Sequence, residues 1–424
     1  MHNPGAERRR LQSLDRSSLE KYQLDRLNSL LSEILPANSF YSSALAGVEL
    51  PLRSLADLER LPFTTKDDLI GAGGGPAANR TWPVERYVRF HQTSGTRGRP
   101  LAVLDTAEDW AWWIECWQYV LDAAGVTPAD CVMMAFSFGP FIGFWSAYEA
   151  SAARGCLVVP GGGMTSAARV ELMRNSRATV VCCTPSYALH LAEVGRQREF
   201  DLGALGVRVL ILAGEPGGSI PATRRRIEQA WRADVIDHGG ATEVGAWGSG
   251  DCEGRGLYVT ESQFISEFRS PTTGGRAKEG DLAELVLTTL GRAGCPVFRY
   301  RTGDLVRPTW CENRFVLLEG GIVGRTDDML TVRGVNVFPT ALEEILRGFP
   351  EVDEFRFTAS RIEEMDQVTV EVEDRLERPT RIAEELHLRL GLRMDVKCVP
   401  PGTLPRFEGK GKRFVDNRGS SGTP

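Results

Sequence analysis

Four short apolar runs constrain the fold of this chain more than any other feature of its sequence. They are residues 131–135, 155–159, 178–183 and 207–212, and helical stretches separate them. Strands that alternate with helices in this way form a mainly parallel sheet, because each helix carries the chain back across the sheet. Ligands of such sheets bind at the loops beyond the carboxyl ends of the strands. We therefore predict an α/β fold and expect the functional residues in those loops.

The sequence on either side of this region differs in pattern. Residues 10–70 carry leucines at helical spacing and predict a helical arm, whereas residues 282–320 alternate short strands with turns and predict a small β element. Beyond Pro339 the pattern is that of a compact α+β unit. We predict a large N-terminal region of several subdomains with mainly parallel sheets, residues 1–325, and a small α+β C-terminal domain, residues 326–424.

Composition excludes several classes of protein. A hydrophobic content of 42% and a charged content of 25% over 424 residues are typical of soluble globular proteins, and no apolar run reaches the roughly 20 residues that span a bilayer. The net charge of -6 argues against a nucleic-acid partner, and the N-terminus lacks the apolar segment of a secretory signal. We predict a cytoplasmic protein with no nucleic-acid or membrane partner.

Residues 91–100 have the composition of an anion-binding loop, His-Gln-Thr-Ser-Gly-Thr-Arg-Gly-Arg-Pro. Glycines let backbone N–H groups converge on one anion, hydroxyl groups donate hydrogen bonds, and arginines supply charge. The Gly-Lys-Ser/Thr of a Walker loop is missing, and a solvated turn has the same composition. The residues that we expect to hold phosphate are Thr93, Ser94, Gly95, Thr96, Arg97 and Gly98.

Two glycine-rich segments also follow predicted strands. Residues 213–218, Ala-Gly-Glu-Pro-Gly-Gly, can bring backbone close to a flat ligand, although a plain strand-to-helix turn explains them equally well. Residues 238–245 follow the predicted strand 234–237 and place the Glu243 carboxylate beside the Thr242 hydroxyl among small residues. Both segments are candidates for a ligand site.

Two polar segments lie nearer the C-terminus. Residues 300–304, Tyr-Arg-Thr-Gly-Asp, place Asp304 on a predicted tight turn, where a carboxylate can accept two hydrogen bonds from a ribose diol. Residues 324–328 end in adjacent acids at the predicted domain boundary. The joint presence of all five segments indicates a chemical site more strongly than any one of them.

In this order the five segments resemble those of the adenylate-forming acyl-CoA synthetase superfamily and, within it, the phenylacetate-CoA ligase-like branch. The resemblance covers nearly the whole chain and includes residues 61–68, 334–339 and 402–413. It implies that a carboxylate attacks the α-phosphate of ATP to give an acyl adenylate and pyrophosphate, and that a thiol, usually that of coenzyme A, then displaces AMP. Because the first step brings two anions together, catalysis would consist mainly of charge neutralisation and positioning.

The resemblance also implies roles for individual residues. Lys410 matches the catalytic lysine, since the spacing Gly-Lys-x-x-Arg favours it over Lys412. Glu243 would hold Mg²⁺, which prefers carboxylate, water and phosphate oxygens, next to Thr242 as a second catalytic side chain. The phosphate loop would bind the departing pyrophosphate. The other nucleotide contacts that the resemblance implies are Gly214, Glu215, Pro216, His238, Gly239, Asp304 and Arg325.

The resemblance further implies a mobile C-terminal domain. Asp327 matches the pivot about which this domain rotates between the two half-reactions, although adjacent acids equally suit a helix cap. Gly334 lies in the loop that would then line the coenzyme A channel.

Two positions depart from the family pattern. Gly239 stands where many members carry an aromatic residue that stacks on adenine, so adenine would rest on residues 214–216 instead. Tyr258 replaces a histidine that close relatives combine with cysteines to bind zinc, and we therefore expect no zinc at Cys252 and Cys311.

An aromatic segment at residues 136–145 is the predicted wall of the acid pocket, although ordinary core packing explains it as well. The residues that would enclose a flat aromatic acid are Phe136, Phe141 and Trp145 on one side and Gly240 and Ala241 on the other.

We predict an ATP-dependent ligase that adenylates an aromatic or arylalkanoic acid and transfers the acyl group to coenzyme A, with ATP, Mg²⁺ and coenzyme A as cofactors. Delivery to the pantetheine of an acyl carrier protein is the first alternative. A non-catalytic nucleotide-binding protein is the second, but such a protein would be expected to lose Glu243 or Lys410, and both are present. The identity of the acid and a homodimeric state are left open.

Overall fold

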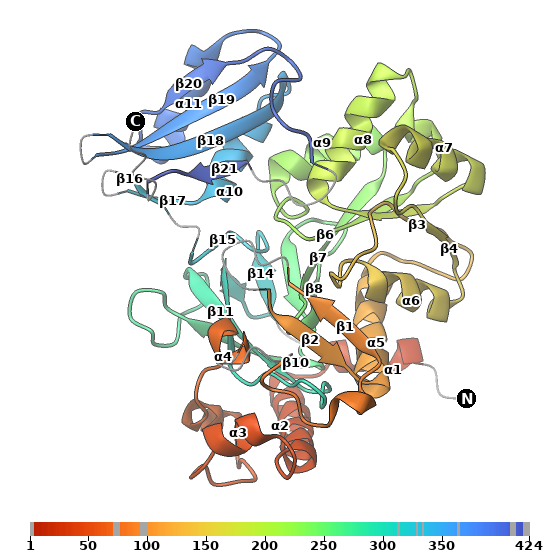
Figure 1. Ribbon diagram of the computed structural model, residues 1–424, viewed down its shortest axis with the longest axis vertical. Coiled ribbons are helices and arrows are strands. Elements are labelled where there is room, and N and C mark those ends of the chain that lie inside the picture. The colour runs from red at the N-terminus through yellow and green to blue at the C-terminus, as the bar shows by residue number, and fades with distance from the viewer. Residues whose placement is uncertain are drawn as a thin grey trace.

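Figure 1 shows a large N-terminal body, coloured red to cyan, with a smaller blue C-terminal unit beside it. We call residues 330–418 the C-terminal unit. The computed structural model describes residues 4–70, 77–93, 100–311, 314–327, 330–332, 335–362, 365–407 and 413–418.

A nine-stranded sheet forms the centre of the N-terminal body, with the strand order β13-β14-β9-β8-β7-β6-β5-β3-β4. The strands from β4 to β7 are parallel, which confirms the predicted α/β fold, and the others are antiparallel. The strands are β3 (Cys131–Met134), β4 (Leu157–Pro160), β5 (Val180–Cys183), β6 (Val209–Ala213), β7 (Asp234–Ala241), β8 (Gly245–Ser249), β9 (Gly256–Val259), β13 (Pro308–Thr309) and β14 (Leu317–Glu319).

Helices cover both faces of this sheet, and this explains why its central strands β3, β5 and β6 are continuously apolar. In β5, Val180 and Cys182 face one hydrophobic core while Val181 and Cys183 face the other. None of the helices in the described ranges has the length and apolar character needed to cross a membrane. The helices around the sheet are α5 (Ala107–Ala123), α6 (Trp145–Arg154), α7 (Ser166–Ser176), α8 (Pro185–Gln197), η3 (Leu202–Ala204) and α9 (Pro221–Trp231).

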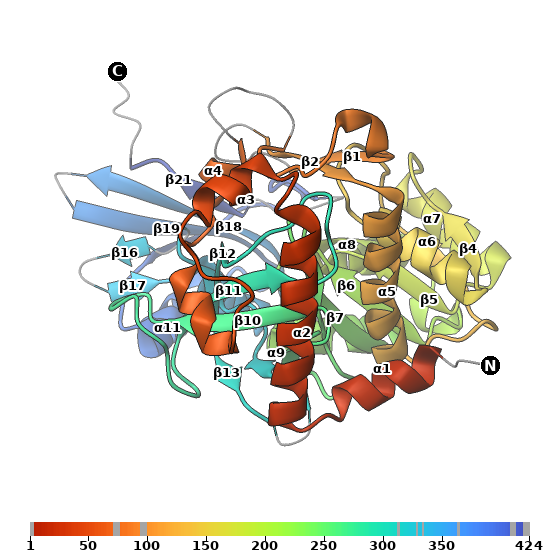
Figure 2. The same ribbon diagram turned by 90° about the horizontal axis from the view of Figure 1, so that it is seen from below.

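The predicted helical arm and small β element are also present, and they pack on each other. Figure 2 shows α2 lying across β10 and β11, and Leu27 and Leu30 of α2 share a core with Ile265 of β10. A four-stranded antiparallel sheet has the order β10-β11-β12-β15, and β1 and β2 form a separate pair. These elements are α1 (Pro4–Gln12), α2 (Arg16–Ile34), α3 (Ser39–Ala44), η1 (Leu55–Arg60), α4 (Lys66–Ile70), η2 (Val84–Arg86), β1 (Arg89–Gln92), β2 (Ala102–Asp105), β10 (Phe264–Arg269), β11 (Ala283–Thr289), β12 (Tyr300–Val306) and β15 (Gly324–Arg325).

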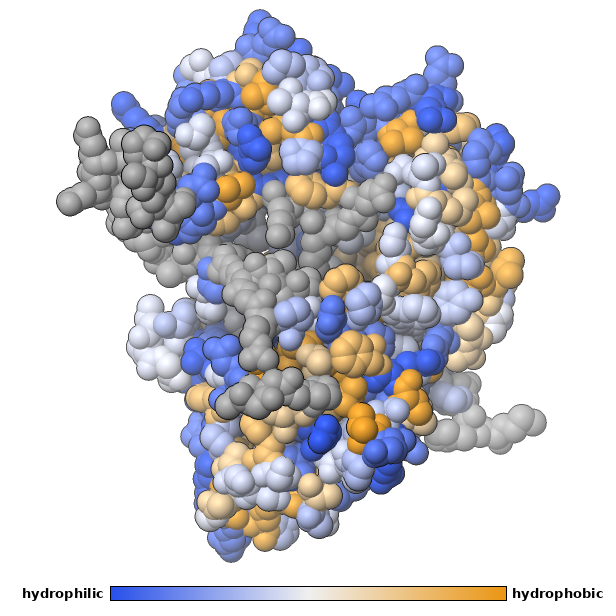
Figure 3. All heavy atoms as spheres, viewed as in Figure 1, coloured by the Kyte–Doolittle hydropathy of each residue, from blue (hydrophilic) through white to orange (hydrophobic). Residues whose placement is uncertain are grey.

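The C-terminal unit has its own hydrophobic core, which runs from Val337 to Met394 and is distinct from the cores of the N-terminal body. Its main sheet has the order β20-β19-β18-β21, and its visible outer face in Figure 3 is mainly hydrophilic. The predicted α+β character is therefore correct, while the boundary at residue 325 stays a prediction. The elements are β16 (Leu330–Val332), β17 (Val335–Val337), α10 (Pro339–Arg347), β18 (Val352–Ile362), β19 (Met365–Asp374), α11 (Pro379–Leu390), β20 (Asp395–Cys398) and β21 (Phe414–Asp416).

Helix α11 offers a matched test of this core. Leu386 is 0% exposed and Leu388 is 79% exposed on the same helix. We expect Leu386→Ala to lower the free energy of unfolding of the C-terminal unit by about 2–5 kcal/mol, because it leaves a cavity. Leu388→Ala should change it by less than about 0.5 kcal/mol. Urea denaturation followed by circular dichroism measures both, and equal losses would contradict the packing of α11.

Candidate functional site

The carboxyl end of β7 carries the first group of predicted site residues. This strand does not end at Asp237, as the sequence suggested, but continues through Ala241. Thr242 and Glu243 lie in the turn that joins it to the antiparallel strand β8. Arg292 fixes this turn, because its Nη1 donates a hydrogen bond to the Thr242 carbonyl oxygen at 3.1 Å.

Glu243 is oriented by a tyrosine that the sequence analysis did not assign to the site. The Tyr300 hydroxyl donates to Glu243 Oε1 at 2.7 Å. Burial, and after it the nearby Glu243 carboxylate, raise the pKa of Tyr300, so its hydroxyl stays protonated. The half-buried carboxylate is thereby held in one orientation, and an oriented carboxylate oxygen is a ligand that Mg²⁺ prefers.

Asp304 and Arg325 form an ion pair across two neighbouring strands. They are register partners in β12 and β15, and Arg325 Nη1 lies 2.7 Å from Asp304 Oδ1. The predicted tight turn at Asp304 is wrong, since this residue lies within β12. A local irregularity does occur there: Gly303 has φ +75°, and a Cβ at this position would lie 3.0 Å from Arg325 Nη2. Arg325 Nε also contacts Asp327 Oδ1, at 3.0 Å.

The two groups form one polar cluster, which we define as Glu243, Tyr300, Asp304 and Arg325. Tyr300 connects them, because its hydroxyl donates to Glu243 and it lies on the same strand, β12, as Asp304. The structure thus brings together the residues predicted to bind Mg²⁺ and ribose. The segment Tyr-Arg-Thr-Gly-Asp held the signal for Tyr300, since it begins with this residue.

His238 and Gly239 are buried within β7. His238 Nδ1 donates to the Gly248 carbonyl oxygen at 2.7 Å, and its ring centroid lies 4.3 Å from that of Trp117. Burial lowers the pKa of His238 to about 4, so the imidazole is neutral near pH 7. A Cβ on Gly239 would lie 2.7 Å from the ring of Trp247, so a larger side chain does not fit at this position unless Trp247 moves.

The glycine-rich segment after β6 lies against the start of α8. The Ser186 backbone N–H donates to Glu215 Oε1 at 2.7 Å. Gly214 has φ +95°, a backbone conformation that favours glycine. Pro216 follows in the same loop before α9. This loop therefore occupies the carboxyl edge of the sheet beside β7, as expected for a nucleotide contact.

Several predicted residues lie outside the described part of the chain: Ser94, Gly95, Thr96, Arg97, Gly98, Gly334 and Lys410. Thr93 is described and closes the base of the phosphate loop. Its backbone N–H donates to the Leu101 carbonyl oxygen at 2.9 Å, and its Oγ1 accepts from the Leu101 N–H at 3.0 Å.

A buried ion pair connects the β1–β2 hairpin with the turn that carries Glu243. Asp105 of β2 and Arg292 have fully buried side chains, and Arg292 Nε and Nη2 lie 2.8 and 2.6 Å from Asp105 Oδ1. The same guanidinium donates to the Thr242 carbonyl oxygen. The sequence analysis missed both residues, and neither stands in a recognisable motif.

The aromatic segment is only partly placed as predicted. Phe136 packs against Phe144 with ring centroids 4.7 Å apart, and Trp145 packs against Phe138 at 4.5 Å. Phe141, by contrast, is 47% exposed and has no place in this aromatic packing. Its assignment to the pocket wall stays a prediction.

A second aromatic contact extends this packing to β7. Phe144 lies 6.1 Å from Trp117, which in turn contacts His238. Gly240 is exposed and Ala241 is half-buried at the end of β7. Trp117 was not predicted from the sequence as a neighbour of the site, and it is buried.

No cluster of three or more histidine, cysteine, aspartate or glutamate side chains suited to a metal occurs among the residues that the structure describes. Cys252 is exposed and Cys311 is half-buried.

Two family models match the chain. The AMP-binding enzyme model matches residues 52–274, and the AMP-binding enzyme C-terminal domain model matches residues 334–418.

Curated relatives match almost end to end. The phenylacetate-coenzyme A ligase of Thermus thermophilus is 34% identical over 96% of this chain and 98% of its own length. The phenylacetate-coenzyme A ligase of Pseudomonas putida is 33% identical over 95% of this chain and 94% of its own length.

Among solved structures, a 2-hydroxyisobutyryl-CoA ligase matches in two states to different degrees. In its postadenylation state with an acyl-AMP the TM-score is 0.90, at 27% identity and covering 96% of this chain and 92% of that one. In its thioesterification state with coenzyme A the TM-score is 0.72 at 28% identity, and the match covers 97% of this chain and 92% of that one.

The protonation state of His238 can be tested directly. We expect its imidazole to stay neutral, with the hydrogen on Nδ1, down to about pH 5, because its pKa is lowered from 6.5 to about 4. Histidine ¹⁵N NMR across pH 4–8 measures this, and the spectrum of His238→Gln identifies the resonance among the five histidines. A midpoint near 6.5 would contradict the buried environment.

Proposed function

Since this chain belongs to the AMP-binding enzyme family, in its phenylacetate-CoA ligase-like branch, we propose that it adenylates an aromatic or arylalkanoic acid and transfers the acyl group to coenzyme A. The family models and the near-complete match to phenylacetate-coenzyme A ligases support the two-step reaction. The polar cluster carries the proposal structurally, because it groups carboxylates, a hydroxyl and a guanidinium at the carboxyl edge of the sheet.

The residues of the polar cluster suit an adenylation site. Asp304 offers a carboxylate to the ribose hydroxyls, and its pairing with Arg325 holds that carboxylate in place. Glu243, oriented by Tyr300, would hold Mg²⁺. When bound, Mg²⁺ would neutralise phosphate charge while the acid approaches. We further propose that Lys410 approaches the acid and the α-phosphate, and that residues 94–98 hold pyrophosphate.

We infer that the structure has the domain arrangement of the adenylation half-reaction. One ligase, at nearly equal identity and coverage, matches with a TM-score of 0.90 in its postadenylation state and 0.72 in its thioesterification state. A change in the relative placement of two rigid parts lowers such a score without changing either part. The role of Asp327 as the pivot and that of Gly334 in the coenzyme A channel stay predictions.

The acid pocket is proposed around Phe136 and Trp145, which pack in the aromatic group beside α6. Gly240 and Ala241 at the end of β7 would form the opposite wall. A flat apolar acid suits aromatic packing of this kind.

The names of the curated relatives support coenzyme A rather than a carrier protein as the acceptor. A cytoplasmic location and a homodimer stay predictions from the sequence.

Release of pyrophosphate tests the proposal. Purified protein with ATP and Mg²⁺ is incubated with phenylacetate, benzoate and other aryl acids, and hydroxylamine traps the acyl adenylate as a hydroxamate. We expect acid-dependent release for at least one arylalkanoic acid, with 2-hydroxyisobutyrate as the aliphatic control. Absence of release with every acid would contradict the proposed function. Coenzyme A and a holo carrier protein, added separately, then identify the acceptor.

Lys410→Ala separates the two half-reactions. We expect adenylation to fall by about 10²–10³-fold, because a charge that stabilises the transition state is lost. Thioester formation from supplied acyl adenylate and coenzyme A should stay within about twofold, since the lysine then acts only in the other step. Lys412→Ala is the matched control and should leave both steps unchanged. Equal loss in both steps would contradict the assignment.

A further inference from the structure

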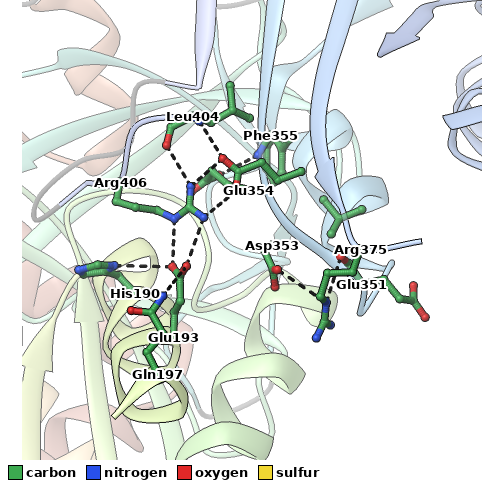
Figure 4. A network of polar contacts seen from close by, with 12 residues as sticks. His190, Glu193, Gln197, Glu351, Asp353, Glu354, Phe355, Arg375, Leu404 and Arg406 are labelled. Atoms are coloured by element: carbon green, nitrogen blue, oxygen red, sulfur yellow. Dashed lines mark hydrogen bonds and ion pairs between the residues drawn. The ribbon is translucent and has the colours of Figure 1, made fainter. Parts of the chain in front are cut away.

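The C-terminal unit meets α8 and α9 of the N-terminal body through polar side chains. A cavity of about 310 Å³ lies between the two parts and is lined by residues of both. Figure 1 shows the C-terminal unit beside these helices, and Figure 4 shows part of the polar network between them. The arginines that line the cavity are Arg196, Arg226, Arg347, Arg406 and Arg413.

Arg406 is shared between a carboxylate from each part. Its Nε and Nη2 donate to Glu193 of α8 at 3.0 and 3.3 Å. Its Nη1 and Nη2 also donate to Glu373 of β19, at 3.1 and 2.7 Å. Figure 4 shows the guanidinium of Arg406 directed at the Glu193 carboxylate. Such two-point contacts hold a guanidinium in one orientation.

Two other residues of α8 contact the Glu193 carboxylate. Gln197 Nε2 donates to Glu193 Oε1 at 3.3 Å, and His190 Nδ1 lies 3.8 Å from Glu193 Oε2. His190, and after it Arg406, lower the pKa of Glu193 to about 2, so the carboxylate is ionised at neutral pH. A fixed negative charge therefore faces the C-terminal unit.

The two carboxylates that hold Arg406 differ in exposure. Glu373 is 1% exposed and lies in the same unit as Arg406, whereas Glu193 is 23% exposed and lies across the interface. When the contact with Glu193 breaks, Arg406 keeps Glu373 as its partner. The interface can thus open without leaving an unpaired buried charge, which would be costly.

A second arginine ties the same part of the chain to α8. Arg413 Nη1 donates to Ser186 Oγ at 2.8 Å, while its Nε and Nη2 donate to Glu354 at 2.6 and 3.0 Å. Arg406 and Arg413 stand on either side of Lys410 in the sequence. Helix α8 therefore contacts the chain both before and after the proposed catalytic lysine.

We propose that Glu193 is a positioning residue for the adenylation half-reaction, which it supports by holding Arg406 and the C-terminal unit against α8. This assignment rests on the proposed function. A contact made in only one of two domain arrangements shifts the equilibrium toward that arrangement. Glu193 therefore favours adenylation and takes no part in thioester formation.

Glu193→Gln tests this assignment, because it removes the charge and keeps the size of the side chain. We expect acid-dependent ATP–pyrophosphate exchange to slow by about three- to tenfold, the effect of losing a two-point ion pair that is partly exposed. Thioester formation from supplied acyl adenylate should be unchanged or faster. Glu171→Gln is the control, since Glu171 pairs with Arg174 within α7. Unchanged exchange, or equal losses in both half-reactions, would overturn the assignment.

Hydrogen–deuterium exchange gives a readout that does not depend on activity. In Glu193→Gln, peptides covering residues 185–197 and 400–407 should exchange faster than in the wild type, and Glu171→Gln should not change them. Arg406→Lys should act like Glu193→Gln, because an ammonium cannot form two-point contacts with both carboxylates. Unchanged protection in Glu193→Gln would overturn the proposal even in an active enzyme. If the wild type activates no acid, the proposed function is contradicted, and with it the link between Glu193 and adenylation. Faster hydrogen–deuterium exchange in Glu193→Gln would still establish the contact between Glu193 and Arg406.

Discussion

The buried ion pair between Asp105 and Arg292 is the interaction on which the candidate site depends. Both side chains are fully buried, and the Arg292 guanidinium also binds the Thr242 carbonyl oxygen. One cation therefore joins three segments that are far apart in the sequence: the hairpin of the phosphate loop, the chain after β11, and the turn after β7. Removal of one partner from such a pair costs about 3–5 kcal/mol, because the other charge stays buried and unpaired. Because breaking the pair is this unfavourable, the β1–β2 hairpin and the turn that carries Glu243 keep their relative positions.

The polar cluster depends on that fixed frame. Tyr300 can donate to Glu243 only when β12 and the turn after β7 keep their relative positions, and Asp304 can pair with Arg325 only when β12 and β15 keep their register. All four residues belong to the N-terminal body. These four side chains thus keep their relative positions within the N-terminal body, and the proposed motion concerns the C-terminal unit, whose sequence includes Lys410.

The sequence predicted the elements whose pattern is local. The four apolar runs became parallel strands, of which β3, β5 and β6 are buried, and the helix behind Pro339 begins at that residue. Contacts between distant residues were not predictable in this way. Arg292 and Asp105 reach the site through tertiary packing, and neither stands in a sequence motif that marks a buried ion pair. Aromatic composition likewise does not tell which residues of a segment face solvent, as the 47% exposure of Phe141 shows.

The interface between the two parts has the chemistry of a contact that opens and closes. Each part encloses its own apolar core, so separation exposes little of either. Polar contacts across the interface include those of Arg406 with Glu193, Arg196 with Asp353, Arg413 with Ser186, and Arg226 with the Val352 carbonyl oxygen. Water can replace such polar partners at small cost, whereas it cannot replace apolar packing. Because Arg406 and Arg413 each keep a glutamate of their own unit, the proposed rotation leaves neither arginine without a carboxylate partner. The same arrangement makes α8 the surface at which the balance between the two half-reactions is set.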